Sequence, residues 1–478
     1  MFARPIYERM ASADDCPNCP TLRAELKALR IELAALRLEL RDLRGLVNQT
    51  SRNSSKPPSS DPPSAPPRPA PPPTGRKQGG QPGHEGSTRA LFEAIDVDRV
   101  VSVRPERCGG CRKDLPRSAP AVGEPRRVQV VEIPDAAATV TEYVLERLCC
   151  PGCFSVTEGE APDDVTGCIG PRFQASLAML AGRYRGSRRE VAEMVEELYG
   201  PKARISLGWL STIEERTAAA LGSAYEEARR AVQGAPVVNA DETSYPERFK
   251  KGWLWTASTK DVVFFMHDRE RSRRAAIRLL GAFRGVLVTD RWRSYHHAKN
   301  RRQICLAHLK RNFQGLVDRG GAAMKVGRPA LKILAQVFTL STDYEEGRVS
   351  FKSLRRRVTK IRAKFLDVLR RGEKSADPKA AGMCRDIISF FPCIWTFTRH
   401  EGTPVTNNLA ERRLRPAVLW RKGSFGTQSD RGSRFLERIL TVVQTLRIQG
   451  RSLIEFIAQS VRNARLGRPA PRLLPDTG

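Results

Sequence analysis

The sequence predicts a multidomain α+β protein, and three observations lead to this prediction. A leucine heptad near the N-terminus precedes a proline-rich run, two Cys-x-x-Cys pairs flank a valine-rich segment, and two later apolar runs each end in an aspartate. Such patterns are typical of a coiled coil, a small metal-bound module and buried strands, respectively. The 478 residues are enough for two or three domains, at roughly 100–200 residues each.

Residues 1–50 are expected to form a leucine-zipper-like coiled coil. Apolar residues recur at alternating spacings of four and three: Leu22, Leu26, Leu29, Leu33, Leu36, Leu40, Leu43 and Val47. A single amphipathic helix lying on a core is the alternative, but the regularity of this seam favours the coiled coil. We therefore expect a homodimer or a higher oligomer.

Residues 51–90 are expected to be a disordered, proline-rich linker. Ten prolines fall between Pro57 and Pro73, among serine, alanine and arginine. This composition offers too little apolar surface for a packed core.

Residues 91–160 are expected to form a small zinc-binding β module, with short strands at 100–103, 128–133 and 140–145. The candidate ligands are Cys108, Cys111, Cys150 and Cys153, with 38 residues between the two pairs. Four thiolates can hold one structural Zn²⁺. The alternative is four unrelated thiols, although an odd total of 11 cysteines argues against a disulfide framework.

Residues 161–232 are expected to be helical and to resemble a helix-turn-helix. Ser187 and Glu190 have the spacing of a capping box at the start of a helix over 188–199. Gly200 and Pro201 break that helix, and a second runs from 206 to 221. A plain helical hairpin explains the pattern equally well.

Residues 233–460 are expected to form an α/β domain that carries three acidic candidates, with a helical insertion at about 315–400. Apolar strands over 236–241 and 285–290 end in Asp241 and Asp290, and a helix that begins near 407 carries Glu411. Adjacent strands lie about 4.8 Å apart, so the two aspartates can meet. A three-carboxylate cluster can hold two Mg²⁺ ions for phosphoryl transfer. Each carboxylate alone could equally be a solvated strand end or a helix cap.

The composition points to a polyanionic partner. The formal charge is +30 and the pI is about 10.3, which is typical of nucleic-acid binding. Nine Lys or Arg fall within 352–371, where the alternative is an ordinary solvated helix face. The candidate DNA-binding residues are His308, Arg311, Arg355, Arg356, Arg357, Arg412, Arg413, Arg415, Arg421 and Lys422. No run of roughly 20 apolar residues predicts a membrane span. We expect a cytoplasmic, nucleoid-associated bacterial protein with a short tail over 461–478.

An ordered set of motifs carries a resemblance to a known family. Besides the two cysteine pairs, the motifs are NSSKPPSSD at 53–61, GQPGH at 80–84, DET at 241–243, DRWRSY at 290–295, CLAHLKRNF at 305–313, NN at 407–408, AER at 410–412 and RK at 421–422. Together they resemble the transposases of the insertion sequence 66 family over nearly the full chain.

This resemblance implies a ribonuclease-H-like DDE catalytic core in which Asp241, Asp290 and Glu411 bind metal. It also implies binding of terminal repeats, DNA cleavage, strand transfer into target DNA and small accessory proteins from the same element. Thr406 stands where the family usually has Asp, and we expect it to cap the following helix. The alternatives are a ribonuclease-H-like nuclease without strand transfer, or an inactive transposase-derived, zinc-containing DNA-binding protein.

Overall fold

The computed structural model describes residues 19–54, 61, 90–133, 136–163, 165 and 167–475. The chain divides into two compact units, one of residues 66–138 and one of residues 1–65 and 139–478. Most of the expected linker, including the GQPGH motif, lies outside the described residues.

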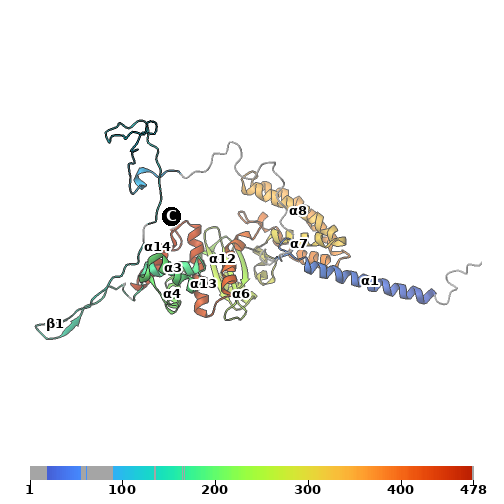
Figure 1. Ribbon diagram of the computed structural model, residues 1–478. Helices are drawn as coiled ribbons and strands as arrows, with labels where there is room; N and C mark the ends of the chain where they lie inside the picture. Colours follow the sequence, from blue (N-terminus) through green and yellow to red (C-terminus); the bar gives the residue numbers. More distant parts are fainter. Residues whose placement is uncertain are drawn as a thin grey trace, which may run out of the picture. The chain divides into compact units, whose positions relative to one another are not determined.

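A five-stranded sheet forms the centre of the larger unit, in the order β5-β4-β3-β6-β7 (Figure 1). The strands are β3 (Val237–Ser244), β4 (Trp253–Ser258), β5 (Val263–Asp268), β6 (Val286–Thr289) and β7 (Arg302–Ile304). β3, β4 and β5 form an antiparallel meander, whereas β6 and β7 run parallel to β3. β6 and β7 are buried along their whole length, as parallel strands covered on both faces must be. The second apolar strand, predicted over 285–290, is confirmed as β6.

Helices from both ends of the larger unit share one hydrophobic core with this sheet. They are α2 (Pro171–Gly182), α3 (Arg188–Tyr199), α4 (Leu207–Ala220), α5 (Gly222–Gly234), α6 (Arg273–Leu280), α12 (Asn408–Ser424), α13 (Asp430–Ile448) and α14 (Leu453–Arg465). The capping box of α3 is confirmed, since Ser187 and Glu190 bond each other's backbone N–H groups. A 3-10 turn, η3 (Pro201–Ala203), separates α3 from α4.

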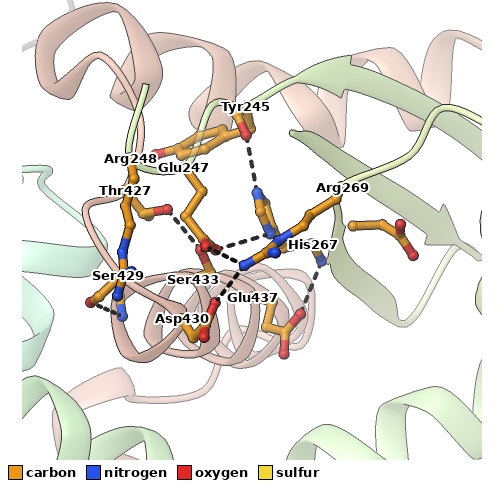
Figure 2. A network of polar contacts seen from close by, with 12 residues as sticks. Tyr245, Glu247, Arg248, His267, Arg269, Thr427, Ser429, Asp430, Ser433 and Glu437 are labelled. Atoms are coloured by element: carbon orange, nitrogen blue, oxygen red, sulfur yellow. Dashed lines mark hydrogen bonds and ion pairs between the residues drawn. The ribbon is translucent and has the colours of Figure 1, made fainter. Parts of the chain in front are cut away.

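α13 lies along the edge strand β5 and bonds its backbone. The N–H groups of Val263, Phe265 and His267 donate to side chains of Thr445, Thr441 and Glu437 at 3.1, 3.0 and 2.9 Å. The acceptors on α13 and the donors on β5 are similarly spaced, because four helical residues rise about 6 Å and two strand residues advance about 6.6 Å. Figure 2 shows the last of these hydrogen bonds, from His267 to Glu437.

A polar network centred on buried Glu247 holds the β3–β4 connection and the end of β5 against the start of α13 (Figure 2). Glu247 accepts hydrogen bonds from Ser433 at 2.7 Å and from Arg269 at 3.3 Å. The ring of His267 bonds the carbonyl of Tyr245 at 3.0 Å. Only 7 % of the Glu247 side chain is exposed, so these partners offset the cost of burying its charge.

A helical bundle with a hydrophobic core of its own is inserted between β7 and α12. Its elements are α7 (Leu306–Arg319), α8 (Gly321–Glu345), α9 (Phe351–Glu373), α10 (Pro378–Ser389), α11 (Phe391–Ile394) and the 3-10 turn η5 (Thr396–Thr398). Phe313, Phe365 and Trp395 form the aromatic centre of the bundle and are fully buried. The helix α9, which contains the basic run at 352–371, buries Leu354 and Val358 in this core.

The prediction of three strands in the valine-rich segment was wrong. No strand forms over the described residues of 100–103, 128–133 and 140–145, and valines such as Val100 and Val130 are 86 % and 84 % exposed. These valines are exposed and pack against no described apolar surface, so side-chain packing does not stabilise a sheet there. The short strands β1 (Arg147–Cys149) and β2 (Val156–Glu158) form instead, and a 3-10 turn, η2 (Ala94–Asp96), lies upstream.

The expected tail from 461 is in part structured, because α14 runs to Arg465 and Leu473 is fully buried. In addition, the guanidinium of Arg451 donates to the carbonyl of Leu473 at 2.6 Å. Among the described residues, no helix is both long enough and apolar enough to cross a membrane.

α1 (Cys19–Val47) is a single helix, and Asn53, the first residue of the NSSKPPSSD motif, lies against α7. The amide of Asn53 donates to Asp318 at 3.0 Å. A Cβ on Gly315 would lie 2.5 Å from the Asn53 carbonyl oxygen, so only glycine permits this approach. The seam leucines of α1 are about half exposed, with Leu29 at 61 % and Leu36 at 54 %.

We expect these exposed leucines to drive self-association. Replacing Leu29, Leu36 and Leu43 with Glu should shift the mass in solution toward the monomer, because charges would then face each other across the a/d seam. Light scattering at matched concentrations measures the shift. The control is Ile31→Glu, which changes an equally exposed residue of α1 outside the seam. An unchanged mass of the triple variant would assign association to another surface.

Candidate active site

The pairing of β3 with β6 aligns the two candidate aspartates. Val237 lies opposite Val286, and Asn239 lies opposite Val288. Two further residues along each chain come Asp241 and Asp290, which therefore occupy matching positions. Asp290 directly follows β6, as predicted. Asp241 lies within β3 and not at its end.

This position of Asp241 corrects the predicted strand, which ended at 241. β3 continues to Ser244 because it also pairs with β4, where Asp241 lies opposite Thr256. The antiparallel neighbour thus extends β3 beyond the point where its parallel neighbour stops.

Asn407 fixes the start of α12 against β3. Its side-chain amide donates to the carbonyl of Ala240 at 2.8 Å, and its Oδ1 accepts from the amide of Asn239 at 3.0 Å. Its backbone N–H donates to the sulfur of Cys305 at 3.1 Å. Asn407 is fully buried, so each of these bonds replaces solvation that it has lost.

This arrangement, the Asn239–Asn407 clasp, brings Glu411 beside Asp241. Glu411 lies four residues after Asn407 on the same helix face, and Asp241 lies two residues after Asn239 on the same strand face. Both steps cover about 6 Å, so the helix and the strand advance together. The clasp therefore holds the carboxylates of Glu411 and Asp241 at the same position along the direction of β3.

Thr406 does not cap α12, and this expectation was wrong. The N-cap residue is Asn407, whose side chain makes no capping bond because the clasp uses it. Thr406 contributes its backbone carbonyl, which accepts from the Asn239 amide at 3.3 Å. The clasp is thus intact with threonine at this position.

The carboxylates near Asp241 form an electrostatically unfavourable cluster. Burial raises the pKa of Asp241 well above its usual range. The charges of neighbouring carboxylates raise this pKa further, those of Glu242, Asp290 and Glu411. A divalent cation would relieve this repulsion, and carboxylate oxygens are the ligands that Mg²⁺ prefers.

Glu242 organises the loop that follows Asp290, a role that the sequence pattern did not reveal. Its side chain is 2 % exposed and accepts from the hydroxyl of Tyr295 at 2.7 Å and from Arg271 at 2.8 Å. Arg271 lies over the ring of Trp292, 4.3 Å from its centroid, and the N–H of Trp292 donates to a carboxylate oxygen of Asp290 at 2.9 Å. Tyr295 and Trp292 thus pack and orient this loop.

Arg302 is a second residue that the sequence pattern did not reveal. It is fully buried and donates to the hydroxyl of Thr289 at 2.8 Å and to the carbonyls of Asp290 and Trp292 at 2.5 and 2.8 Å. Burial lowers the pKa of Arg302, and the charge of Asp290 partly offsets this effect. A guanidinium therefore supports the backbone of the Asp290 loop from within the core.

His308 and Arg311 extend from α7 toward Glu411. His308 Nδ1 and Arg311 Nη2 each lie 3.7 Å from Glu411 Oε1. Among the described residues, only Cys305, His308 and Glu411 bring three metal-ligand atoms within 4.8 Å of one another. The three predicted carboxylates do not form such a group there.

The basic candidates divide between two elements. Arg355, Arg356 and Arg357 are exposed on α9 of the bundle. On α12, Arg412, Arg415 and Lys422 are exposed, whereas Arg413 and Arg421 are half-buried. Arg421 donates to the hydroxyls of Thr243 and Ser244 at 2.9 and 2.6 Å. It therefore joins the end of β3 to α12.

The two cysteine pairs form turns of the same construction. In each, the first cysteine's N–H donates at 2.9 Å to the carbonyl five residues on, and the residue after the second cysteine, Arg112 or Phe154, has a φ of 60°. Hydrogen bonds from backbone N–H groups in the turn lower the pKa of Cys108. The first pair lies in unit 66–138 and the second in the larger unit. A shared zinc site therefore stays a prediction.

Comparison with known proteins places the chain in a family. Residues 169–434, more than half of the chain, match the family described as "Transposase IS66 family". The chain belongs to the IS66 transposase family. All three acidic candidates fall within the matched range, and residues 14–90 match a family of unknown function, DUF6444.

Relatives of the transposase occur in Sinorhizobium fredii. The proteins y4qI and y4jD are 23 % and 24 % identical over 266 and 259 residues, which are 49 % and 47 % of this chain and 49 % and 50 % of theirs. The protein y4hP is 23 % identical over 413 residues, 74 % of this chain and 70 % of its own. All three are described as uncharacterized. The chain spans about half the length of the first two relatives.

Asn407→Ala should destabilise the protein by about 1–3 kcal/mol, because the buried Ala240 carbonyl loses this donor and the Asn239 amide keeps only its 3.3 Å bond to the Thr406 carbonyl. The midpoint of denaturant-induced unfolding measures this loss. Asn408→Ala is the matched control, since Asn408 is the exposed neighbour on α12. Equal midpoints for the two variants would mean that the clasp contributes nothing to stability.

Proposed function

We propose that the chain is a DNA transposase that binds the terminal repeats of an insertion sequence and catalyses metal-dependent DNA cleavage and strand transfer. The observation that carries the proposal is the convergence of three acidic residues from separate elements. The β3–β6 pairing aligns Asp241 with Asp290, and the Asn239–Asn407 clasp adds Glu411. The IS66 family match covers all three.

The sheet topology supports a ribonuclease-H-like core. Within the order β5-β4-β3-β6-β7, β4 alone is antiparallel to the other strands. This is the arrangement expected of the catalytic core that the family resemblance implies. The carboxylates then lie on the central strand, after its parallel neighbour and on an adjacent helix.

Asp241, Asp290 and Glu411 would hold two Mg²⁺ ions. When bound, such a pair of ions stabilises charge on the attacking and leaving oxygens of a phosphodiester. The buried cluster and the raised pKa of Asp241 fit a cation site. The chain's own contribution is orientation: Glu242 and Arg302 fix the Asp290 loop, and the clasp fixes Glu411.

Exposed basic residues would hold the DNA. Arg355, Arg356 and Arg357 on α9 are candidates for contacts with phosphates, as are Arg412, Arg415 and Lys422 on α12. Phosphate contacts position DNA but carry no sequence information directly. We assign recognition of the terminal repeats to the helix-turn-helix-like pair α3–α4. Dimerisation through α1, small accessory proteins and a nucleoid location complete the proposal.

The decisive assay tests joining. A labelled, pre-cut terminal repeat with a free 3′-hydroxyl, a supercoiled target and Mg²⁺ should give joined products. Glu411→Gln should lower their yield roughly a hundredfold or more, since metal-ion catalysis supplies several kcal/mol. Glu226→Gln, at an exposed position of α5, should leave the yield unchanged.

Two results of this assay would contradict the proposal. Cleavage without joining, even with accessory proteins present, would identify a nuclease. Absence of any Mg²⁺-dependent cleavage, with DNA binding retained, would identify a transposase-derived DNA-binding protein.

One structural Zn²⁺ held by Cys108, Cys111, Cys150 and Cys153 is also part of the proposal. The matching turns support it, because N–H groups that bond sulfur favour the thiolate form that zinc requires.

We expect Cys108→Ser to lower the zinc content of the full chain by one equivalent, as measured by elemental analysis. The control is Cys168→Ser, an exposed cysteine outside both pairs. Zinc content that is the same in both variants would exclude the site.

A further inference from the structure

The start of α7 combines two features that are typical of metal sites, namely different kinds of ligand atom and a helical spacing of three residues. Cys305 is the N-cap residue of α7, and His308 lies three residues on, so both face the same side. Glu411 reaches the same place from α12, and the three ligand atoms lie within 4.8 Å of one another. This group is called the Cys305 site below.

Two polar atoms of the Cys305 site are buried without a hydrogen-bond partner among the described residues. They are His308 Nδ1 and Glu411 Oε1, which lie 3.7 Å apart. The ring nitrogen and the carboxylate oxygen face each other, and a cation bound between them would satisfy both. Their separation is close to the roughly 3.4 Å edge of a tetrahedron with bonds of about 2.0–2.1 Å, the lengths that zinc makes to nitrogen and oxygen.

The third atom, the sulfur of Cys305, indicates which metal would bind. It is fully buried and accepts the backbone N–H of Asn407 at 3.1 Å. Burial raises the pKa of Cys305 to about 11, and hydrogen bonds from the N–H groups of Asn407, His308 and Ala307 partly offset this effect. A metal ion that binds here would displace the thiol proton, because the thiolate is the form that binds metal. Sulfur, imidazole and a single carboxylate are ligands for zinc, whereas magnesium prefers oxygen alone.

We propose that Cys305, His308 and Glu411 form a zinc site that is separate from the four cysteines of the two turns. Three protein ligands leave the fourth position of a tetrahedral Zn²⁺ to water. Arg311 Nη2 lies 3.7 Å from the same Glu411 oxygen, and its positive charge opposes a cation. Zinc in this site therefore binds more weakly than four thiolates would bind it, and it exchanges with solution.

Occupation of the Cys305 site has a consequence that rests on the proposed function. Glu411 is one of the carboxylates assigned to magnesium, and an oxygen bound to zinc is no longer free for that role. Zinc therefore inhibits Mg²⁺-dependent cleavage by withdrawing one ligand from the catalytic cluster.

Cobalt spectroscopy on the full chain tests the site without any DNA reaction. Protein preloaded with one equivalent of zinc is titrated with Co²⁺, and the charge-transfer band from thiolate to cobalt is recorded. We expect the band in the wild type and in Cys384→Ser, a buried cysteine of α10, but not in Cys305→Ser. Any cobalt bound by the two cysteine turns contributes equally to all three spectra, so the difference isolates Cys305.

A second variant keeps the test valid if Cys305→Ser does not fold. His308→Ala retains the thiol but should weaken cobalt binding by about tenfold or more, since even outer partners of a metal site are worth 10–100-fold. Identical titrations of the wild type and His308→Ala would overturn the proposal. So would an equal band in the wild type and a folded Cys305→Ser.

The inhibition is measured separately. In Mg²⁺-dependent cleavage, the zinc concentration for half inhibition should rise about tenfold or more in Cys305→Ser, in line with loss of a ligand. The cobalt band without any cleavage would leave the zinc site standing and remove the proposed function. Cleavage without the cobalt band would leave the proposed function standing and remove the zinc site.

Discussion

The candidate active site depends on one buried asparagine. Asn407 bonds the backbone of β3, the side chain of Asn239 and the sulfur of Cys305. These bonds join the central strand to α12 and to the start of α7. Arg421 adds a second link between β3 and α12, through the hydroxyls of Thr243 and Ser244. Asn407 is the link at the end of α12 that carries Glu411, so an uncharged residue holds this part of the carboxylate cluster in place.

The same region closes the helical insertion. The N–H of Leu306, where the chain enters the bundle, donates to the carbonyl of Val405, where it leaves, at 2.9 Å. The two ends of this long insertion thus meet next to the Asn239–Asn407 clasp. Because its ends are fixed and its core is its own, the bundle adds a basic surface without disturbing the sheet. A closed insertion of this kind costs little entropy beyond that of joining its ends.

The sequence predicted local features well and long-range contacts poorly. Strand β6, the helices α3 and α4 and the capping box of α3 follow from apolar periodicity and cap residues, which neighbouring residues determine. The valine-rich strands failed because the pattern cannot reveal whether a partner surface exists. The partners of Glu242 and Arg302 lie up to 53 residues away along the chain, and those of Cys305 about a hundred. The spacing of residues within a short motif does not indicate which distant residues will contact each other.

The contact between α13 and β5 has a consequence for how copies of this chain can associate. A sheet edge with free N–H and C=O groups invites strands from other molecules. Here the outward N–H groups of Val263, Phe265 and His267 are all occupied. The carbonyl of Phe265 also accepts the hydroxyl of Tyr225 at 2.9 Å. The central sheet therefore cannot grow from one molecule into the next along β5. Molecules of this chain that come into contact at this edge can therefore do so without their sheets merging.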